Sequence, residues 1–275
     1  MTFNEARRYG DEFLKASGVD NSSAESLWML QAASGKTGSE LLLHSSNELK
    51  SEEEEKFKEM LSERAGSRPV QYVLGKWDFY GGEFKVGEGA LIPRPETEGL
   101  VEIAAGLLRE VENPVIIDLC AGTGCIGLTL ARLFPSSRVY LVEKYDEALS
   151  FLSENALGLP NAEIIKGDIF SDEDIGRLPV CDLLVSNPPY VKSSEIPSLA
   201  PEVLREPREA LDGGDDGLDF YRRLSQIIPS LCKGAYALEC GDGQGKEIEK
   251  ILPGSKTLKD LSGLDRYVVK ETSGC

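Results

Sequence analysis

The tetrapeptide Asn187-Pro188-Pro189-Tyr190 has the residue types in this chain best suited to chemistry. It follows an apolar run at 181–186 that predicts a buried parallel strand. Because proline lacks a backbone N–H and has a fixed φ, the chain must leave the sheet there, at the carboxyl edge where open α/β sheets bind ligands. The Asn187 side-chain oxygen and the Pro188 carbonyl can each accept one hydrogen of a planar –NH2 group, while the Tyr190 ring covers its face. A strand ended by prolines, with an incidental Asn, is the simpler alternative.

A second predicted strand, 115–119, runs into a glycine turn that is followed by a helical pattern. This is a nucleotide-binding arrangement, because a backbone without Cβ atoms can approach a ligand closely. Gly122-x-Gly124-x-x-Gly127 satisfies the dinucleotide pattern, but Asp118 before the turn and Glu143 at the end of the next strand fit a different ligand. A carboxylate at Glu143 can accept both hydroxyls of a ribose. A solvated surface acid is the alternative for this residue.

Strands and helices alternate beyond residue 113, which predicts a mainly parallel sheet with helices on both faces. The connection around Gly263 is too short for a crossover helix, so the last two strands should be antiparallel. The predicted strands are 115–119, 138–143, 162–165, 181–186, 234–240, 256–259 and 266–270.

The chain before this region divides into two further segments. Residues 1–72 predict a small helical bundle, with capping-box spacing at Thr2–Glu5 and at Ser51–Glu54. Residues 73–93 alternate aromatic and polar side chains around glycines, which predicts a β-hairpin whose aromatic residues mainly pack. The α/β domain then comprises residues 94–275.

The charge balance bears on the kind of partner. Thirty Lys and Arg residues against 47 Asp and Glu residues give a net charge of −17. A protein that holds duplex nucleic acid by its phosphates normally has a basic face, and here the basic residues are scattered. An acidic enzyme suits a basic protein partner.

Composition also indicates the compartment. With one histidine, His44, and no C-x-x-C pair, a metal site is not expected, and reduced thiols in a cytoplasmic protein are the simplest interpretation. No apolar run is long enough to span a bilayer and the N-terminus has no signal-peptide core, so we expect no membrane partner. The cysteines are Cys120, Cys125, Cys181, Cys232, Cys240 and Cys275.

Several blocks of sequence make the chain resemble the class I S-adenosylmethionine-dependent methyltransferases. More closely, it resembles the HemK/PrmC family, which methylates the glutamine side-chain amide of peptide chain release factors. The resemblance implies a Rossmann-like, seven-stranded, mostly parallel sheet with one antiparallel strand, and an N-terminal helical domain that recognises the release factor. It also places Arg94 beside the active site, where a salt bridge is the expected role. The blocks are 68–75, 91–98, 118–124, 187–190, 206–211 and 260–266.

The resemblance implies a site for S-adenosylmethionine, which would leave as S-adenosylhomocysteine. It places Asp168 at the adenine amino group and Ile169 against the ring, although a helix N-cap by Asp168 or Ser171 is the alternative. Asp118 would support the glycine turn or the methionine amino group. Cys120 departs from the family, which commonly has Gly at this position. The residues expected to contact the donor are Asp118, Cys120, Ala121, Gly122, Thr123, Gly124, Glu143, Asp168, Ile169 and Asn187.

The acceptor side should use Asn187, Pro188 and Tyr190 in catalysis, with Pro189 also contacting the substrate. The implied function is methylation of the N5 nitrogen of the glutamine in the Gly-Gly-Gln loop of class I release factors, by a monomer without direct nucleic-acid contact. The residues alone indicate only a methyltransferase acting on a planar amino or amide nitrogen. Adenine in nucleic acid and another protein glutamine are alternative substrates. A non-catalytic binding module and a nicotinamide-dependent oxidoreductase are alternatives of another class.

Overall fold

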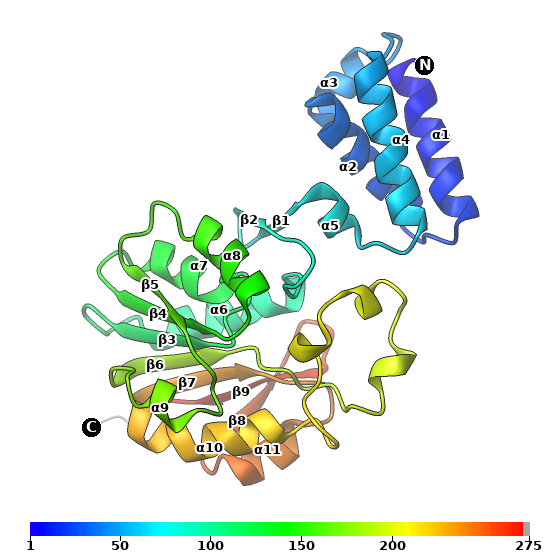
Figure 1. Cartoon of the computed structure of the whole chain (residues 1–275). Helices are drawn as coiled ribbons and strands as arrows, with labels where there is room; N and C mark the ends of the chain where they lie inside the picture. The colour runs from blue at the N-terminus through cyan, green and yellow to red at the C-terminus, as the bar shows by residue number, and fades with distance from the viewer. Residues whose placement is uncertain (272–275) are drawn as a thin grey trace. The chain divides into compact units, whose positions relative to one another are not determined.

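The computed structural model describes residues 1–271, and contacts between residues divide the chain into two units (Figure 1). The helical unit comprises Met1–Lys76 and the short segment Ala200–Arg205. The α/β unit comprises Trp77–Leu199 and the chain from Glu206 onward. No local pattern in residues 200–205 predicted that this segment would pack with the helical unit.

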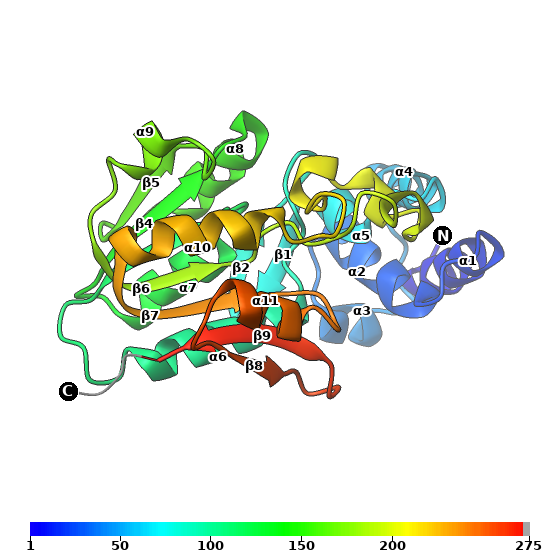
Figure 2. The same ribbon diagram turned by 90° about the horizontal axis from the view of Figure 1, so that it is seen from below.

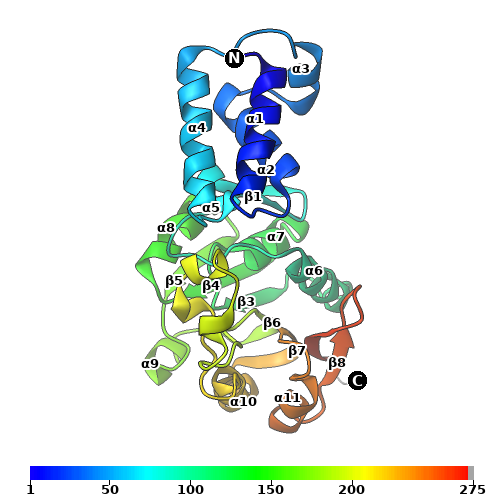
Figure 3. The same ribbon diagram turned by 90° about the vertical axis from the view of Figure 1, so that its right-hand side faces the viewer.

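The helical unit packs its helices around an apolar core that includes Phe57 and Met29 (Figure 3). The capping box at Thr2 is confirmed, because the Glu5 backbone N–H donates to Thr2 Oγ1 at 3.2 Å. The second expected box is wrong by one residue. Ser51 is already helical, so the backbone N–H of Lys50 donates to Glu53 instead. The helices are α1 (Phe3–Ala16), α2 (Ser22–Ser34), α3 (Gly38–Leu43), α4 (Ser51–Ala65) and α5 (Val70–Leu74).

A buried arginine ties the segment 200–205 to this unit. The guanidinium of Arg64 pairs with Glu25 at 2.5 Å and with Glu202 at 2.9 Å. Arg205 also donates to the carbonyl of Gly66 at 3.1 Å. Because a buried cation requires such partners, these contacts explain why a segment so distant in sequence belongs to the helical unit.

Strands β1 (Lys76–Phe79) and β2 (Gly82–Lys85) form a separate two-stranded sheet. Phe79 and Phe84 meet edge to face, with ring centroids 6.0 Å apart, and both are buried in the core of the α/β unit. Their role is therefore packing.

The main sheet has seven strands in the order β5-β4-β3-β6-β7-β9-β8. Strand β9 is antiparallel to both of its neighbours and the other pairings are parallel, which confirms the expected pattern. The largest difference from the prediction is that β7 begins at Cys232 rather than at 234. The strands are β3 (Val115–Leu119), β4 (Arg138–Glu143), β5 (Ala162–Lys166), β6 (Cys181–Ser186), β7 (Cys232–Glu239), β8 (Lys256–Lys259) and β9 (Asp265–Lys270).

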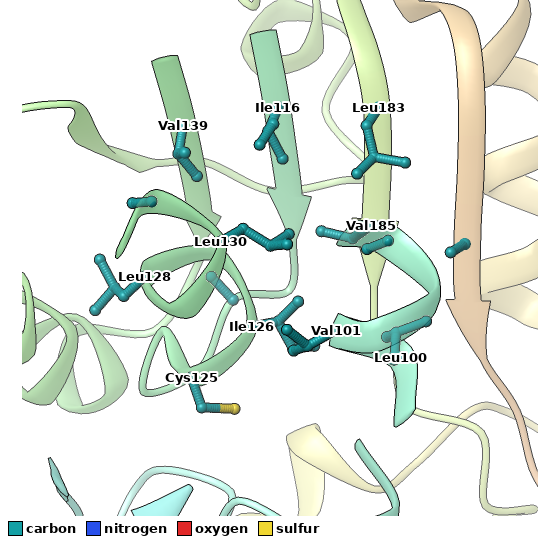
Figure 4. Packing of buried hydrophobic residues seen from close by; sticks show 14 of the residues in the cluster. Leu100, Val101, Ile116, Cys125, Ile126, Leu128, Leu130, Val139, Leu183 and Val185 are labelled. Carbon is teal, nitrogen blue, oxygen red and sulfur yellow. The ribbon is translucent and has the colours of Figure 1, made fainter. Parts of the chain in front are cut away.

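Helices cover both faces of this sheet (Figure 2). Alternate residues of a strand point to opposite faces, so Ile116 packs against α6 and α7 while Ile117 packs on the α10 side. Figure 4 shows the first of these layers, with Leu100 of α6 and Ile126 of α7 facing the strand residues. The helices are α6 (Pro95–Leu107), α7 (Cys125–Leu133), α8 (Asp146–Asn155), α9 (Asp172–Ile175), α10 (Asp219–Leu231) and α11 (Gly245–Ile251).

Within residues 1–271, no helix combines the length and the apolar composition that crossing a bilayer requires. The five cysteines in that range have free thiols, and Cys275 lies outside the described residues.

Candidate active site

A pocket in the α/β unit lies where four parallel strands end. Its lining comes from the turns that follow β3, β4, β5 and β6, together with the segment that leads into α6. This is the carboxyl edge at which open α/β sheets bind ligands. Nine of the predicted site residues line it: Cys120, Ala121, Gly122, Thr123, Glu143, Asp168, Ile169, Asn187 and Pro189. The others do not line it: Asp118 lies in strand β3, and Gly124, Pro188 and Tyr190 lie on the same turns as the lining residues.

The glycine turn after β3 needs residues that tolerate a positive φ. Gly122 has φ of 56°, and a Cβ added there would meet no atom within 4 Å. Gly124 has φ of 82°, and a Cβ there would collide with Leu152 and Leu128. The two glycines thus differ: Gly124 allows close packing beneath the turn, while Gly122 leaves its backbone open to the pocket. Cys120 has φ of 59°, in the left-handed region that favours glycine.

Asp118 lies beneath the turn and is fully buried. Its Oδ2 accepts a hydrogen bond from the Gly127 backbone N–H at 2.9 Å, whereas its Oδ1 has no partner among the described residues. Burial raises the pKa of Asp118 to about 7, and the nearby Glu143 carboxylate acts in the same direction. Asp118 is therefore bonded to the first turn of α7, beneath the glycine turn.

Glu143 ends β4 and is held by backbone groups. Its Oε2 accepts from the Gly122 N–H at 2.8 Å, and its Oε1 accepts from the N–H groups of Lys144 and Tyr145 at 2.7 and 2.9 Å. The carboxylate is therefore fixed at the pocket wall and is not a freely solvated acid, with 7 % of the residue exposed.

Asp168 and Ile169 follow β5, on the same side of the pocket. Ser171 caps α9, so helix capping does not explain Asp168. One oxygen of Asp168 accepts from the Phe170 N–H, and the other pairs with Lys144 at 2.9 Å. Partial burial would raise the pKa of Asp168, but these two partners hold it below its ordinary value.

The loop after β6 is held by close backbone contacts. Val191 N donates to the Leu211 carbonyl at 2.9 Å, and the side chain of Gln244 donates to the Tyr190 carbonyl at 2.9 Å. A Cβ at Gly213 or Gly217 would lie within 3 Å of this loop, so both glycines permit the approach. The loop that carries Asn187 is therefore rigidly seated.

Two residues beside Asn187 were not anticipated. Asn187 Nδ2 donates to Thr97 Oγ1 at 3.4 Å, and Thr97 Oγ1 donates to Glu239 Oε2 at 2.7 Å. Tyr190 OH lies 3.5 Å from Glu239 Oε1. Burial, and then the Glu239 charge, raise the pKa of Tyr190, so the phenol keeps its proton. The sequence signal that could have identified Glu239 was an acidic residue at the end of an apolar strand, as for Asp118.

The expected salt bridge of Arg94 is present, and its partner is Glu206. Glu206 is almost completely buried and also accepts from the Ile92 N–H at 3.0 Å. Arg94 lines the pocket, so this pair holds the segment before α6 against the loop that follows β6.

Comparison with protein families gives two matches. Residues 5–75 match the model described as PrmC N-terminal domain, and residues 102–216 match the model described as Methyltransferase small domain. Proteins named release factor glutamine methyltransferase are similar over most of the chain. The protein from Fusobacterium nucleatum is 37% identical, over 94% of this chain and 75% of its own. The one from Bacillus cereus is 34% identical, over 98% of this chain and 99% of its own.

The chain belongs to the release factor glutamine methyltransferase family.

Solved structures agree on the fold of this family member. The catalytic domain of hMettl16, in complex with the MAT2A 3′UTR hairpin 6, has a TM-score of 0.57 at 15% identity, over 78% of this chain and 82% of that one. The chain is thus a methyltransferase with a class I fold, and family and fold imply S-adenosylmethionine as the methyl donor.

Proposed function

We propose that the chain methylates the N5 side-chain nitrogen of the glutamine in the Gly-Gly-Gln loop of class I release factors, with S-adenosylmethionine as donor. The observation that carries the proposal is that Asn187 lines the same pocket as the glycine turn and Glu143. A group suited to hold an amide –NH2 therefore lies beside groups suited to hold a nucleoside. The names of the relatives support the choice of a release-factor glutamine.

The donor fits the residues present. The open space over Gly122 admits a ligand against the backbone. Asp118 would support the glycine turn from beneath, through its bond to the Gly127 N–H. Glu143 would accept the ribose hydroxyls with the lone pairs that its backbone partners leave. Asp168 would accept from the adenine amino group, with Ile169 against the ring. The remaining contacts would come from Cys120, Ala121, Thr123 and Gly124.

When bound, S-adenosylmethionine supplies a methyl group on a sulfonium sulfur and leaves as S-adenosylhomocysteine. The difficulty lies with the acceptor, because a carboxamide nitrogen shares its lone pair with the carbonyl. Asn187 Oδ1 and the Pro188 carbonyl would accept the two N–H hydrogens, which orients the nitrogen for attack and stabilises positive charge as it develops there. Pro189 and Tyr190 would pack against the amide. The proton would leave to water after methyl transfer, when the nitrogen is far more acidic.

The helical segment 1–72 would recognise the release factor, the hairpin at 73–93 would connect it to the rest, and residues 94–275 would form the catalytic domain. The net charge of −17 suits a basic partner and disfavours direct contact with nucleic acid. The chain would act as a monomer.

A methyl-transfer assay tests the proposal. Purified protein and methyl-labelled S-adenosylmethionine are incubated with a release factor, with the same factor after replacement of the Gly-Gly-Gln glutamine, and with duplex DNA. We expect label on the intact factor alone. Label on DNA, or equal label on both forms of the factor, would contradict the proposed substrate.

A further inference from the structure

The acceptor residue Asn187 is the end of a hydrogen-bond chain that begins at a buried carboxylate. Glu239 is 1 % exposed and Thr97 is also 1 % exposed, so neither exchanges its partner for water. The chain runs from Glu239 Oε2 to the Thr97 hydroxyl at 2.7 Å and on to Asn187 Nδ2 at 3.4 Å. The other oxygen of Glu239 faces the Tyr190 hydroxyl at 3.5 Å. One side chain therefore reaches both ends of the Asn187–Tyr190 loop.

The direction of these hydrogen bonds is determined by chemistry. An ionised carboxylate can only accept, so the single hydroxyl hydrogen of Thr97 must point to Glu239. The Thr97 oxygen then has only lone pairs to offer to Asn187. Only the –NH2 end of the Asn187 amide can meet a lone pair, so the amide oxygen must turn away from Thr97.

The sheet itself brings these groups together. Strands β6 and β7 are parallel neighbours with Ser186 opposite Leu238, so Asn187 and Glu239 are the next residues along each strand. Thr97 comes from the first turn of α6, which packs over the same strand ends. The contacts thus follow from register and from helix packing, and they do not depend on a flexible surface chain.

We propose that Glu239 and Thr97 are positioning residues that fix the amide orientation of Asn187, so that its oxygen and not its nitrogen meets the substrate –NH2 group. This inference deepens the proposed function and rests on it for the identity of the substrate. An Asn187 amide turned the other way would present its –NH2 group to the –NH2 group of the substrate. The substrate nitrogen would then lose a hydrogen-bond acceptor.

The protonation state of Glu239 controls the direction of the hydrogen bonds that link Glu239, Thr97 and Asn187. Burial raises the pKa of Glu239 to about 7, although the Thr97 hydroxyl and the Arg266 guanidinium act to lower it. Once protonated, Glu239 can donate to Thr97, and the Thr97 hydroxyl is free to donate to the Asn187 oxygen. Turnover should therefore fall as the pH falls below about 7. The titratable groups around Glu239 are Glu96 of α6, Cys125 of α7, Tyr190, Tyr221 of α10, Cys240, and Arg266 and Tyr267 of β9.

Three variants separate positioning from mere stability. Thr97→Val removes the hydroxyl at nearly constant shape, Thr97→Ser restores it, and Glu239→Gln removes the charge. Thr129→Val is a matched control, because Thr129 is equally buried but its hydroxyl donates to the Cys125 carbonyl within α7. We expect Thr97→Val to lower kcat by about 10–100-fold, the cost of a misplaced reacting group, with the Kd for S-adenosylmethionine unchanged. Thr97→Ser and Thr129→Val should keep kcat within about threefold of the wild-type value. A threefold change corresponds to less than half the free energy of a tenfold change.

The pH profile gives a second readout. At saturating donor, the wild-type kcat should fall below pH 7, whereas Glu239→Gln should show a lower and flatter profile. A substrate-free measurement keeps the inference independent of the proposed function. The side-chain amide resonance of Asn187, assigned by its loss in Asn187→Asp, should shift with an apparent pKa near 7 in the wild type and not in Glu239→Gln.

These results distinguish the two levels of the account. If the Asn187 resonance titrates but the protein does not methylate a release factor, the proposed function is contradicted and the positioning role of Glu239 and Thr97 is supported. Two results would overturn the positioning role of Glu239 and Thr97, whatever the substrate. One is an Asn187 resonance that does not move between pH 6 and pH 8, and the other is a Thr97→Val enzyme with wild-type kcat.

Discussion

In the proposed site, the half of the pocket assigned to the methyl donor and the half assigned to the acceptor hold their polar groups in different ways. On the donor side, Glu143 is fixed by three backbone N–H groups from the glycine turn and from the residues that follow it. On the acceptor side, Asn187 is held through the side chains of Thr97 and Glu239, which come from two other elements. A backbone cradle is made by one or two short segments, whereas a side-chain network requires the whole sheet to be assembled first.

The difference suits the two tasks. A nucleoside presents a large surface, and binding it depends on close backbone approach and on a fixed carboxylate. The reacting amide presents one small group whose orientation decides the outcome. A side-chain network can specify that orientation, because each hydroxyl or carboxylate commits its neighbour to donate or to accept.

The largest expected effect is on the acceptor side. Asn187→Ala removes the acceptor proposed for the reacting nitrogen, so kcat should fall by about 100–1000-fold, as it does when one preorganised group is lost from an active site. The Kd for the donor, measured by calorimetry, should change less than about threefold, within about 0.6 kcal/mol. If donor affinity fell in proportion to kcat, the donor and acceptor halves of the pocket would not be functionally separate.

The reverse pattern is expected on the donor side. Glu143→Ala removes a charged hydrogen-bond acceptor, which should weaken donor binding by about 10–100-fold, corresponding to about 1.5–3 kcal/mol. At saturating donor, kcat should remain near the wild-type value. A variant with normal donor affinity would exclude Glu143 from the binding site. Glu163→Ala, at an exposed position of β5, is the control.

A smaller effect on the same side tests the open space over the turn. Gly122→Ala should strain the backbone at φ of 56° and fill the space that the donor needs, which lowers donor affinity by about tenfold, or about 1.4 kcal/mol. Gly158→Ala is a matched control, with φ of 84°, open space around the Cβ position and no place in the pocket. Both should lose stability of about 1–3 kcal/mol from strain. Equal donor affinity in the two variants would contradict the proposed contact.

The smallest effect concerns stability and pH. Because the pKa of Asp118 is raised in the folded chain, its carboxyl contributes stability at low pH that is lost as the pH rises from about 4 to about 7. Asn at this position keeps the acceptor for Gly127 and cannot ionise. Asp118→Asn should therefore raise Tm at pH 8 by at least about 2–4 °C, the shift for about 1 kcal/mol, and change it little at pH 5. A lower Tm at pH 8 would contradict this account.

The sequence was most informative where function depends on consecutive residues. The strands, the glycine turn and Glu143 were predictable because each is a local pattern. Residues 120–123 of the turn line the pocket, whereas Gly124 does not. Thr97 and Glu239 were not predictable, because their significance comes from the register of β6 with β7 and from how α6 packs. Glu202 was missed for a similar reason, since only the folded chain brings it to Arg64.

The most direct test of the central claim locates the methyl group. A class I release factor is incubated with the enzyme and S-adenosylmethionine, digested, and analysed by tandem mass spectrometry, with Asn187→Ala in parallel. We predict one added methyl on the side-chain nitrogen of the Gly-Gly-Gln glutamine with the wild type, and a strongly reduced yield with the variant. A methyl group on any other residue, or equal yields from the two enzymes, would contradict the account.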